Sequence, residues 1–107
     1  MGVEDSSVID FTGLRDGVVH LTIADALDWS DADNHLCLLQ KKLNSYLTFI
    51  ESGQILKDYP LAIDKRIVIS IYMKYEPVDS VADFFHYSQK VIENAGVGFE
   101  CVIGLPR

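Results

Sequence analysis

The residues best suited to chemistry in this sequence are His20 and Asp10, which fall in two strand-like runs near the start of the chain. If both side chains point to the same face of a sheet, they form a pair able to transfer protons, since imidazole titrates near neutral pH. A cross-strand contact on a solvated sheet face explains the same two residues without catalysis, and it is the commoner arrangement.

A second group of acidic and histidine side chains surrounds the start of a predicted central helix: Asp25, Asp28, Asp31, Asp33 and His35. A calcium loop needs spaced oxygen ligands, a glycine turn and a late glutamate, but this stretch has no such glycine. Its last residues fall inside the helix, and no histidine follows at a zinc-binding spacing. We therefore expect helix capping and solvation here, and no metal site.

Sequence motifs of common enzyme classes are absent, because the chain contains no G-x-S-x-G, G-x-x-x-x-G-K or G-x-G-x-x-G pattern. We therefore predict no catalytic residue and no cofactor. Cys37 and Cys101 are the only cysteines and form no C-x-x-C pair, which indicates free thiols in a reducing, cytoplasmic setting. Cys101 is expected to lie buried on the core face of the last strand.

The composition argues against several classes of partner. The 107 residues include 16 Asp and Glu against 9 Lys and Arg, a net charge of −7, whereas nucleic-acid binding needs a basic patch. No apolar run is long enough to cross a bilayer, so no membrane partner is expected. The length suits a single α+β domain over residues 1–107, with residues 1–7 fraying.

The elements that would position these residues begin with the central helix. Ser30 is suited to cap its first turn, with Asp33 three positions later, and Gly53 is suited to end it. Apolar residues at spacings of three and four predict its core stripe: Leu36, Leu39, Leu43, Tyr46, Leu47 and Ile50.

An outer line of the same helix is a candidate contact surface. Leu38 and Phe49 are expected nearly opposite the core stripe, together with Lys42 and His35. Two large apolar residues on one exposed line favour a contact with a partner. Ordinary exposure, or cover by a loop over residues 54–63, explains them equally simply.

Alternating apolar residues predict four strands, over residues 8–14, 18–23, 65–75 and 97–103, and a second helix over residues 77–95. Asp16-Gly17 predicts a tight hairpin between the first two strands. The order β-β-α-β-α-β and right-handed crossovers predict an α+β two-layer sandwich. It has a mixed four-stranded sheet in order 1-2-3-4, with both helices on one face.

The uncovered face of that sheet is the main candidate surface. The contact residues we expect on it are Val18, His20, Arg66, Val68, Tyr72 and Val102. Val8, Asp10, Thr12, Thr22, Ser70, Lys74 and Glu100 are expected beside them in contact with water. Such a face serves as a ligand platform, a dimer interface, or the solvated side of the sheet.

Three runs of the sequence resemble a known group of proteins: residues 3–11, residues 27–29 and residues 39–53, the last ending in Phe-Ile-Glu-Ser-Gly. The chain resembles, over nearly its whole length, a family of short bacterial proteins catalogued only as a domain of unknown function. No catalytic or binding residue carries over from that group. The resemblance implies a free-standing bacterial cytosolic protein.

These observations predict a small, acidic, non-enzymatic domain that binds another protein or a second copy of itself. An immunity-type inhibitor of a basic toxin is one specific form of this expectation, suggested by size and charge. The alternative is a small-molecule binder or enzyme that uses the open sheet around His20, Arg66 and Tyr72.

Overall fold

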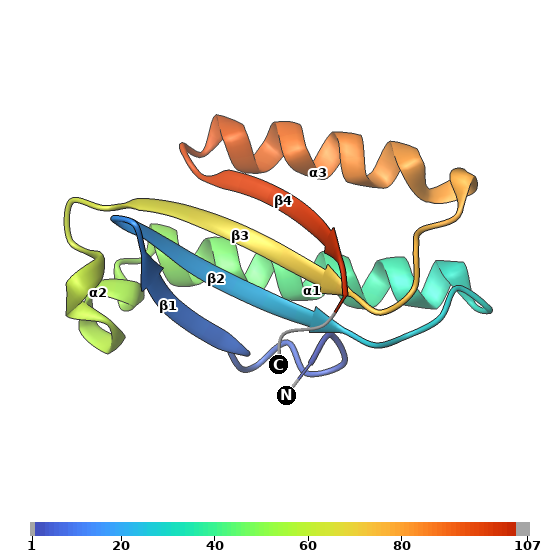
Figure 1. The fold of residues 1–107 in the computed structure, drawn as a ribbon, viewed down its shortest axis with the longest axis horizontal. Coiled ribbons are helices and arrows are strands. Elements are labelled where there is room, and N and C mark those ends of the chain that lie inside the picture. Colours follow the sequence, from blue (N-terminus) through green and yellow to red (C-terminus); the bar gives the residue numbers. More distant parts are fainter. Residues whose placement is uncertain (1, 105–107) are drawn as a thin grey trace.

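The sheet and its helices form two layers in the computed structural model, which describes residues 2–104 (Figure 1). The strands are β1 (Phe11–Arg15), β2 (Val18–Asp25), β3 (Arg66–Met73) and β4 (Gly98–Ile103). The helices are α1 (Ala32–Glu51), α2 (Gln54–Asp58) and α3 (Ala82–Asn94), with 3-10 turns η1 (Pro60–Ala62) and η2 (Asp79–Val81). The predicted α+β class is confirmed.

The strands lie in the order β1-β2-β3-β4, as the sequence predicts. β1 is antiparallel to β2, and β3 is parallel to both β2 and β4. The two crossovers step in the same direction along the sheet, so right-handed connections put α1 and α3 on one face. That layer closes over one buried core, whose largest members include Leu21, Ile69, Ile71, Leu39 and Ile92.

The hairpin between β1 and β2 turns at Asp16 and Gly17, as predicted. Both residues have positive φ, 53° and 76°, which is the type I′ geometry that matches the twist of a two-stranded ribbon. The facing of β1 is the reverse of the expectation. Phe11 pairs with Thr22 on the face away from the helices and is 42% exposed, whereas Thr12, which was expected on that face, pairs with Leu21 on the helix side.

α1 begins one residue later than expected. Asp31 is its N-cap, and its carboxylate accepts a hydrogen bond from the Asn34 backbone N–H at 3.2 Å, while Ser30 Oγ donates to Asp28. Gly53 follows the helix with φ 81°, as a left-handed residue at its end requires.

The buried face of α1 is also rotated from the expected stripe: it comprises His35, Leu39, Lys42, Leu43 and Tyr46. His35 and Lys42 were expected outside. Leu38 and Phe49 are half-buried and pack against the core, so they do not form the exposed outer line that the helix period predicts, and their contact with a partner stays a prediction. The rotation follows from polar groups in the interior that satisfy the histidine and the lysine.

Three further expectations need correction. Residues 54–63 are not an open loop but two short helical segments, held by the buried Ile55 and Ala62. Cys101 is exposed, because β4 is an edge strand whose one neighbouring strand is β3. Residues 2–7 do not fray: Val3 is buried, and its N–H donates to the Ala24 carbonyl at 3.0 Å. Met1 lies outside the described residues.

Candidate functional site

The face of the sheet turned away from α1 and α3 is the candidate site. Strand register places alternate residues of all four strands on it: Phe11, Gly13 and Arg15, then Val18, His20, Thr22 and Ala24, then Arg66, Val68, Ser70 and Tyr72, and last Gly98, Glu100 and Val102. We call this set the open sheet face. No helix of residues 2–104 belongs to this side of the sheet.

The structure brings six of the predicted surface residues together on this face: Val18, His20, Arg66, Val68, Tyr72 and Val102. Neighbouring strands pair His20 with Val68 and Tyr72 with Val102. Arg66 is exposed, and the other five are half-buried by one another. Leu38 and Phe49 lie in the opposite layer and do not join them.

Sequence reasoning missed Phe11 and Arg15, because the facing of β1 was inverted. Phe11 lines a hollow of about 350 Å³ at the β1 side of the face, which is lined by Phe11, Thr12, Gly13, Leu14, Arg15, His20, Thr22 and Tyr72. Arg15 Nη2 lies 3.5 Å from His20 Nε2. The partner of His20 is therefore an arginine, and the proposed proton-transfer pair with Asp10 does not exist.

Ser70 lies on the open sheet face but is shielded from water, with 1% of its surface exposed. Its hydroxyl donates a hydrogen bond to Glu100 Oε1 at 2.7 Å, so the carboxylate of β4 is held against β3. Solvation of Ser70 was the expectation. The larger side chains around a small residue exclude water even where no second layer covers the sheet.

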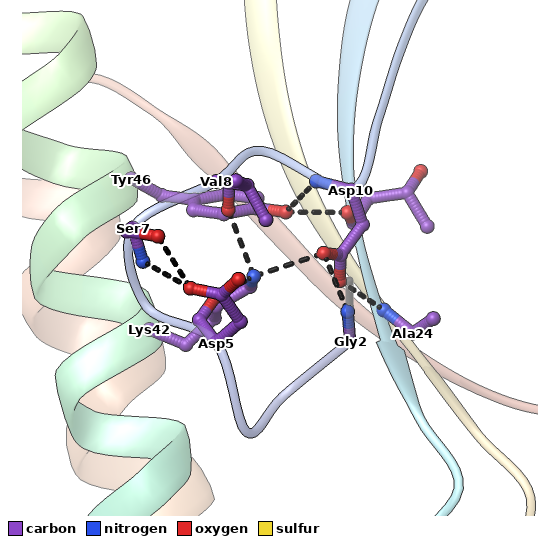
Figure 2. Close-up of polar contacts among 9 residues, drawn as sticks. Gly2, Asp5, Ser7, Val8, Asp10, Ala24, Lys42 and Tyr46 are labelled. Atoms are coloured by element: carbon purple, nitrogen blue, oxygen red, sulfur yellow. Dashed lines mark hydrogen bonds and ion pairs between the residues drawn. The ribbon is translucent and has the colours of Figure 1, made fainter.

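Asp10 is a core residue rather than a surface acid (Figure 2). Its Oδ1 accepts hydrogen bonds from Lys42 Nζ at 2.9 Å and from the Gly2 N–H at 2.8 Å. Its Oδ2 accepts from the Ala24 N–H at 3.0 Å. The carboxylate therefore binds the backbone of β2 at Ala24, past Thr22, which is the last β2 residue that β1 pairs with.

Lys42 and Tyr46 complete this network from α1. Besides Asp10, the ammonium group donates to the carbonyls of Val8, at 2.8 Å, and Asp5. The Tyr46 hydroxyl donates to the Thr22 carbonyl at 2.6 Å and accepts from the Asp10 N–H at 2.9 Å. Burial raises the pKa of Tyr46. The network has no free donor and no access to water, so its role is to fasten residues 2–10 to the helix layer (Figure 2).

Asp25 and His35 form a second buried pair, beneath Trp29. His35 Nε2 lies 2.5 Å from Asp25 Oδ2, and His35 Nδ1 donates to the Asp28 carbonyl at 3.0 Å. The Trp29 ring stacks on the imidazole with centroids 3.8 Å apart. Desolvation raises the pKa of Asp25, and the hydrogen bond with His35 opposes that rise. The expected capping and solvation therefore describe Asp28 and Asp31 but not this pair.

Among residues 2–104, no three His, Cys, Asp or Glu side chains gather closely enough to hold a metal ion. A hollow of about 540 Å³ lies on the helix side of β1, between the N-terminal segment, α1 and α2. Val8, Ile9 and Phe49 supply its apolar surface, and Gln54 and Asp58 stand at its α2 wall. Within the described part of the chain, none of the helices has the length and apolar character needed to cross a membrane.

A family of unknown function, DUF6572, matches residues 1–104 of the chain. The chain belongs to this family. The match spans every strand and helix described above, and it confirms the resemblance to a domain of unknown function. No curated protein and no solved structure is significantly similar to the chain.

Membership of DUF6572 assigns no role to any residue. Two geometric features of this DUF6572 protein bear on its function. One is the open sheet face, which has apolar and cationic side chains. The other is the pair of hollows on either side of β1.

Proposed function

We propose that this protein is a non-enzymatic protein-interaction module and that the open sheet face is its contact surface. The observation that carries this proposal is the apolar content of a sheet face that no helix of residues 2–104 covers: Val18, Val68, Tyr72 and Val102 are half-buried on it, and Phe11 adds apolar surface on β1. Apolar surface of this kind gains roughly 25 cal/mol per Å² when a partner removes it from water.

The distribution of titratable groups supports a binding role over a catalytic one. Asp10 and Lys42 neutralise each other in the interior, and Asp25 and His35 are 0% and 2% exposed. A catalytic acid or base must reach its substrate. His20 is the histidine on the open sheet face, and its side-chain neighbour there is the cation of Arg15.

The charges of the open sheet face indicate the chemistry of the partner. Arg15 and Arg66 are exposed on this face, while Glu100 is held by Ser70, in a protein of net charge −7. A protein with an apolar patch and nearby carboxylates complements this arrangement, because opposite charges steer and orient an encounter. Nucleic acid and anionic membranes are poor partners because the net charge of the protein is −7. The setting we propose is the cytoplasm.

A small-molecule function is the second candidate, and the hollow of about 350 Å³ beside Phe11, His20 and Tyr72 favours it. Its volume lies within the usual range of ligand pockets. Arg15 and His20 at its wall suit an anionic ligand. Against an enzymatic form of this candidate, the partner of His20 among the described residues is Arg15 rather than a carboxylate that could form an acid–base pair with it.

Affinity capture with matched variants tests the proposal. The wild-type protein should retain a specific protein from its host, and Val68→Glu should lose it, because a charge then lies at the centre of the apolar patch. Tyr87→Ala is the control, since Tyr87 lies on α3 and is 70% exposed. Calorimetry with the purified partner should give a loss of at least about tenfold in affinity for Val68→Glu, about 1.4 kcal/mol.

The outcome against the proposal is capture that Val68→Glu and Tyr87→Ala affect equally. Binding of a small anion that Arg15→Ala abolishes, without any protein contact at Val68, would favour the second candidate. Sedimentation of the wild type at high micromolar concentration separates a different protein from a second copy of this chain as the partner.

A further inference from the structure

The outer edge of β1 presents backbone groups that no other strand uses. Because the type I′ turn makes Arg15 and Val18 a hydrogen-bonded pair, the alternation of an antiparallel ladder makes Gly13 with His20 and Phe11 with Thr22 the next bonded pairs. The N–H and carbonyl groups of Thr12 and Leu14 therefore point away from β2. They form an open edge at one side of the sheet.

This edge lacks most of the features that protect edge strands in other proteins. All five residues of β1 are exposed, and the strand contains no lysine and no proline. Its register with β2 is continuous, so no bulge turns the edge aside. Figure 1 shows β1, in dark blue, at one border of the four-stranded sheet, with α2 near its end.

A hollow lies on each face of the same strand. Thr12 lines the hollow of about 540 Å³ on the helix side, with Phe49 across from it and Asp58 on α2. Phe11 and Arg15 line the hollow of about 350 Å³ on the open side. A strand laid beside β1 would direct its side chains alternately into one hollow and the other, since successive side chains of a strand point to opposite faces.

We propose that β1 binds an extended peptide segment of the partner protein, which adds to the sheet as a further strand. The backbone of the segment bonds to Thr12 and Leu14, and its alternate side chains enter the two hollows, as in other cases of strand addition. This inference rests on the proposed role in protein binding. It adds a specific contact at the β1 edge to the contact made by the open sheet face.

The lining residues set the chemistry of the segment. On the open side, Arg15 and His20 favour an acidic side chain beside Phe11. On the helix side, Val8, Ile9 and Phe49 favour an apolar or aromatic side chain. The peptide that fits best therefore alternates acidic and apolar residues. A single extended peptide fits at this edge better than a second folded copy of the protein, because α2 lies near the end of β1 and would obstruct a bulky partner.

Proline substitutions in β1 test the backbone contact. Leu14→Pro removes an N–H that points outward and pairs with no strand of residues 2–104, so the fold should be kept, as edge strands accept proline. Gly13→Pro is the matched control, since it removes an N–H that bonds to β2 and should lower the melting temperature. Thr12→Lys serves as a second edge variant, because it narrows the helix-side hollow without altering the backbone.

Selection from a library of random short linear peptides supplies the probe. The wild type should enrich peptides that alternate acidic and apolar residues, and their affinity should fall by about tenfold or more in folded Leu14→Pro and in Thr12→Lys. In NMR spectra, the Thr12 and Leu14 amides should become protected from exchange on binding, whereas the Phe11 and Gly13 amides are protected already.

Three results would overturn this inference. The first is no enrichment over a folded Leu14→Pro bait. The second is enriched peptides that bind both variants as tightly as the wild type. The third is protein capture that Val68→Glu abolishes and Leu14→Pro leaves intact, which would keep the proposed function and remove the β1 edge from it. A wild type that forms dimers dissociated by Leu14→Pro would assign the edge to a second copy instead of a peptide.

Discussion

The Lys42 ammonium group lies in the interior with its hydrogen bonds directed to Asp10 and to two carbonyls of the N-terminal segment. A buried lysine is costly unless it is paired, and here the pairing is complete. Its hydrogen bonds fasten the segment before β1 to α1.

Replacement of Lys42 by methionine should lower the free energy of unfolding by about 3–5 kcal/mol, because the Asp10 carboxylate is left buried without its cation. Urea denaturation followed by circular dichroism measures the change. Lys41→Met is the matched control: Lys41 is exposed, so its effect should stay within about 0.5 kcal/mol. Equal losses for the two variants would refute the structural role of Lys42.

The two cysteines offer a second test at the residue scale. Desolvation by neighbouring atoms, followed by the negative charge of Glu100, raises the pKa of the Cys101 thiol to about 11, although the residue is partly exposed. Since the thiolate is the reactive form, a Cys37→Ser variant should react with iodoacetamide slowly at pH 8. Its rate should rise about tenfold per pH unit towards pH 11.

Mass spectrometry of the alkylated protein gives the rate at each pH, and the urea-unfolded variant is the control. The unfolded thiol should level off near its ordinary pKa of about 8.5. A folded protein whose rate also levels off there would show that its surroundings do not hold Cys101 protonated.

At the scale of elements, β3 is the central support of the fold because it pairs with both β2 and β4. Ile69 and Ile71 are fully buried beneath the helices, as the alternation of β3 predicts. Ile69→Ala should lower the free energy of unfolding by about 2–5 kcal/mol. The adjacent Val68, half-buried on the open sheet face, should cost less than half as much when changed to alanine, because no second layer packs on it.

Chemical denaturation of the two variants decides between a one-sided and a two-sided core. Equal losses at Ile69 and Val68 would mean that the open sheet face is packed as tightly as the helix side. That result would also weaken the proposal that the face is available to a partner.

The elements themselves were predictable where a local pattern is long and regular. The alternation of β3 and the type I′ signal at Asp16-Gly17 predicted their structures correctly, as Gly53 did for the end of α1. The facing of β1 was predictable from the same turn, because a two-residue loop at Asp16-Gly17 pairs Phe11 with Thr22 and Thr12 with Leu21. The expectation that Thr12 lies on the open sheet face did not apply this register.

The rotation of α1 was missed because the sequence does not show which polar residues find partners in the core. His35 and Lys42 are polar, so periodicity alone places them outside, yet tertiary partners satisfy both in the core. For the candidate site, the alternation of β2, β3 and β4 correctly placed their residues on one face of the sheet, whereas Phe11 and Arg15 of β1 were found from the strand register. The role of these residues in binding stays a prediction.

At the scale of the whole molecule, the helices and the N-terminal segment enclose one side of the sheet, and the other side is uncovered (Figure 1). Asp10, Asp25 and His35 are buried on the helix side. His20, Arg15 and the apolar side chains of the open sheet face lie at the surface. This division is the physical basis for proposing a module that binds a protein through its sheet.

Site-specific photo-crosslinking in the host cell tests whether the open sheet face contacts a protein partner. A photoreactive amino acid replaces Tyr72, on the open sheet face, or Tyr87, on α3, where 70% of the side chain is exposed. We expect a discrete protein adduct from position 72 and none from position 87, and the mass of the adduct distinguishes a different protein from a second copy. An adduct from position 87 alone, or none from position 72, would contradict this expectation.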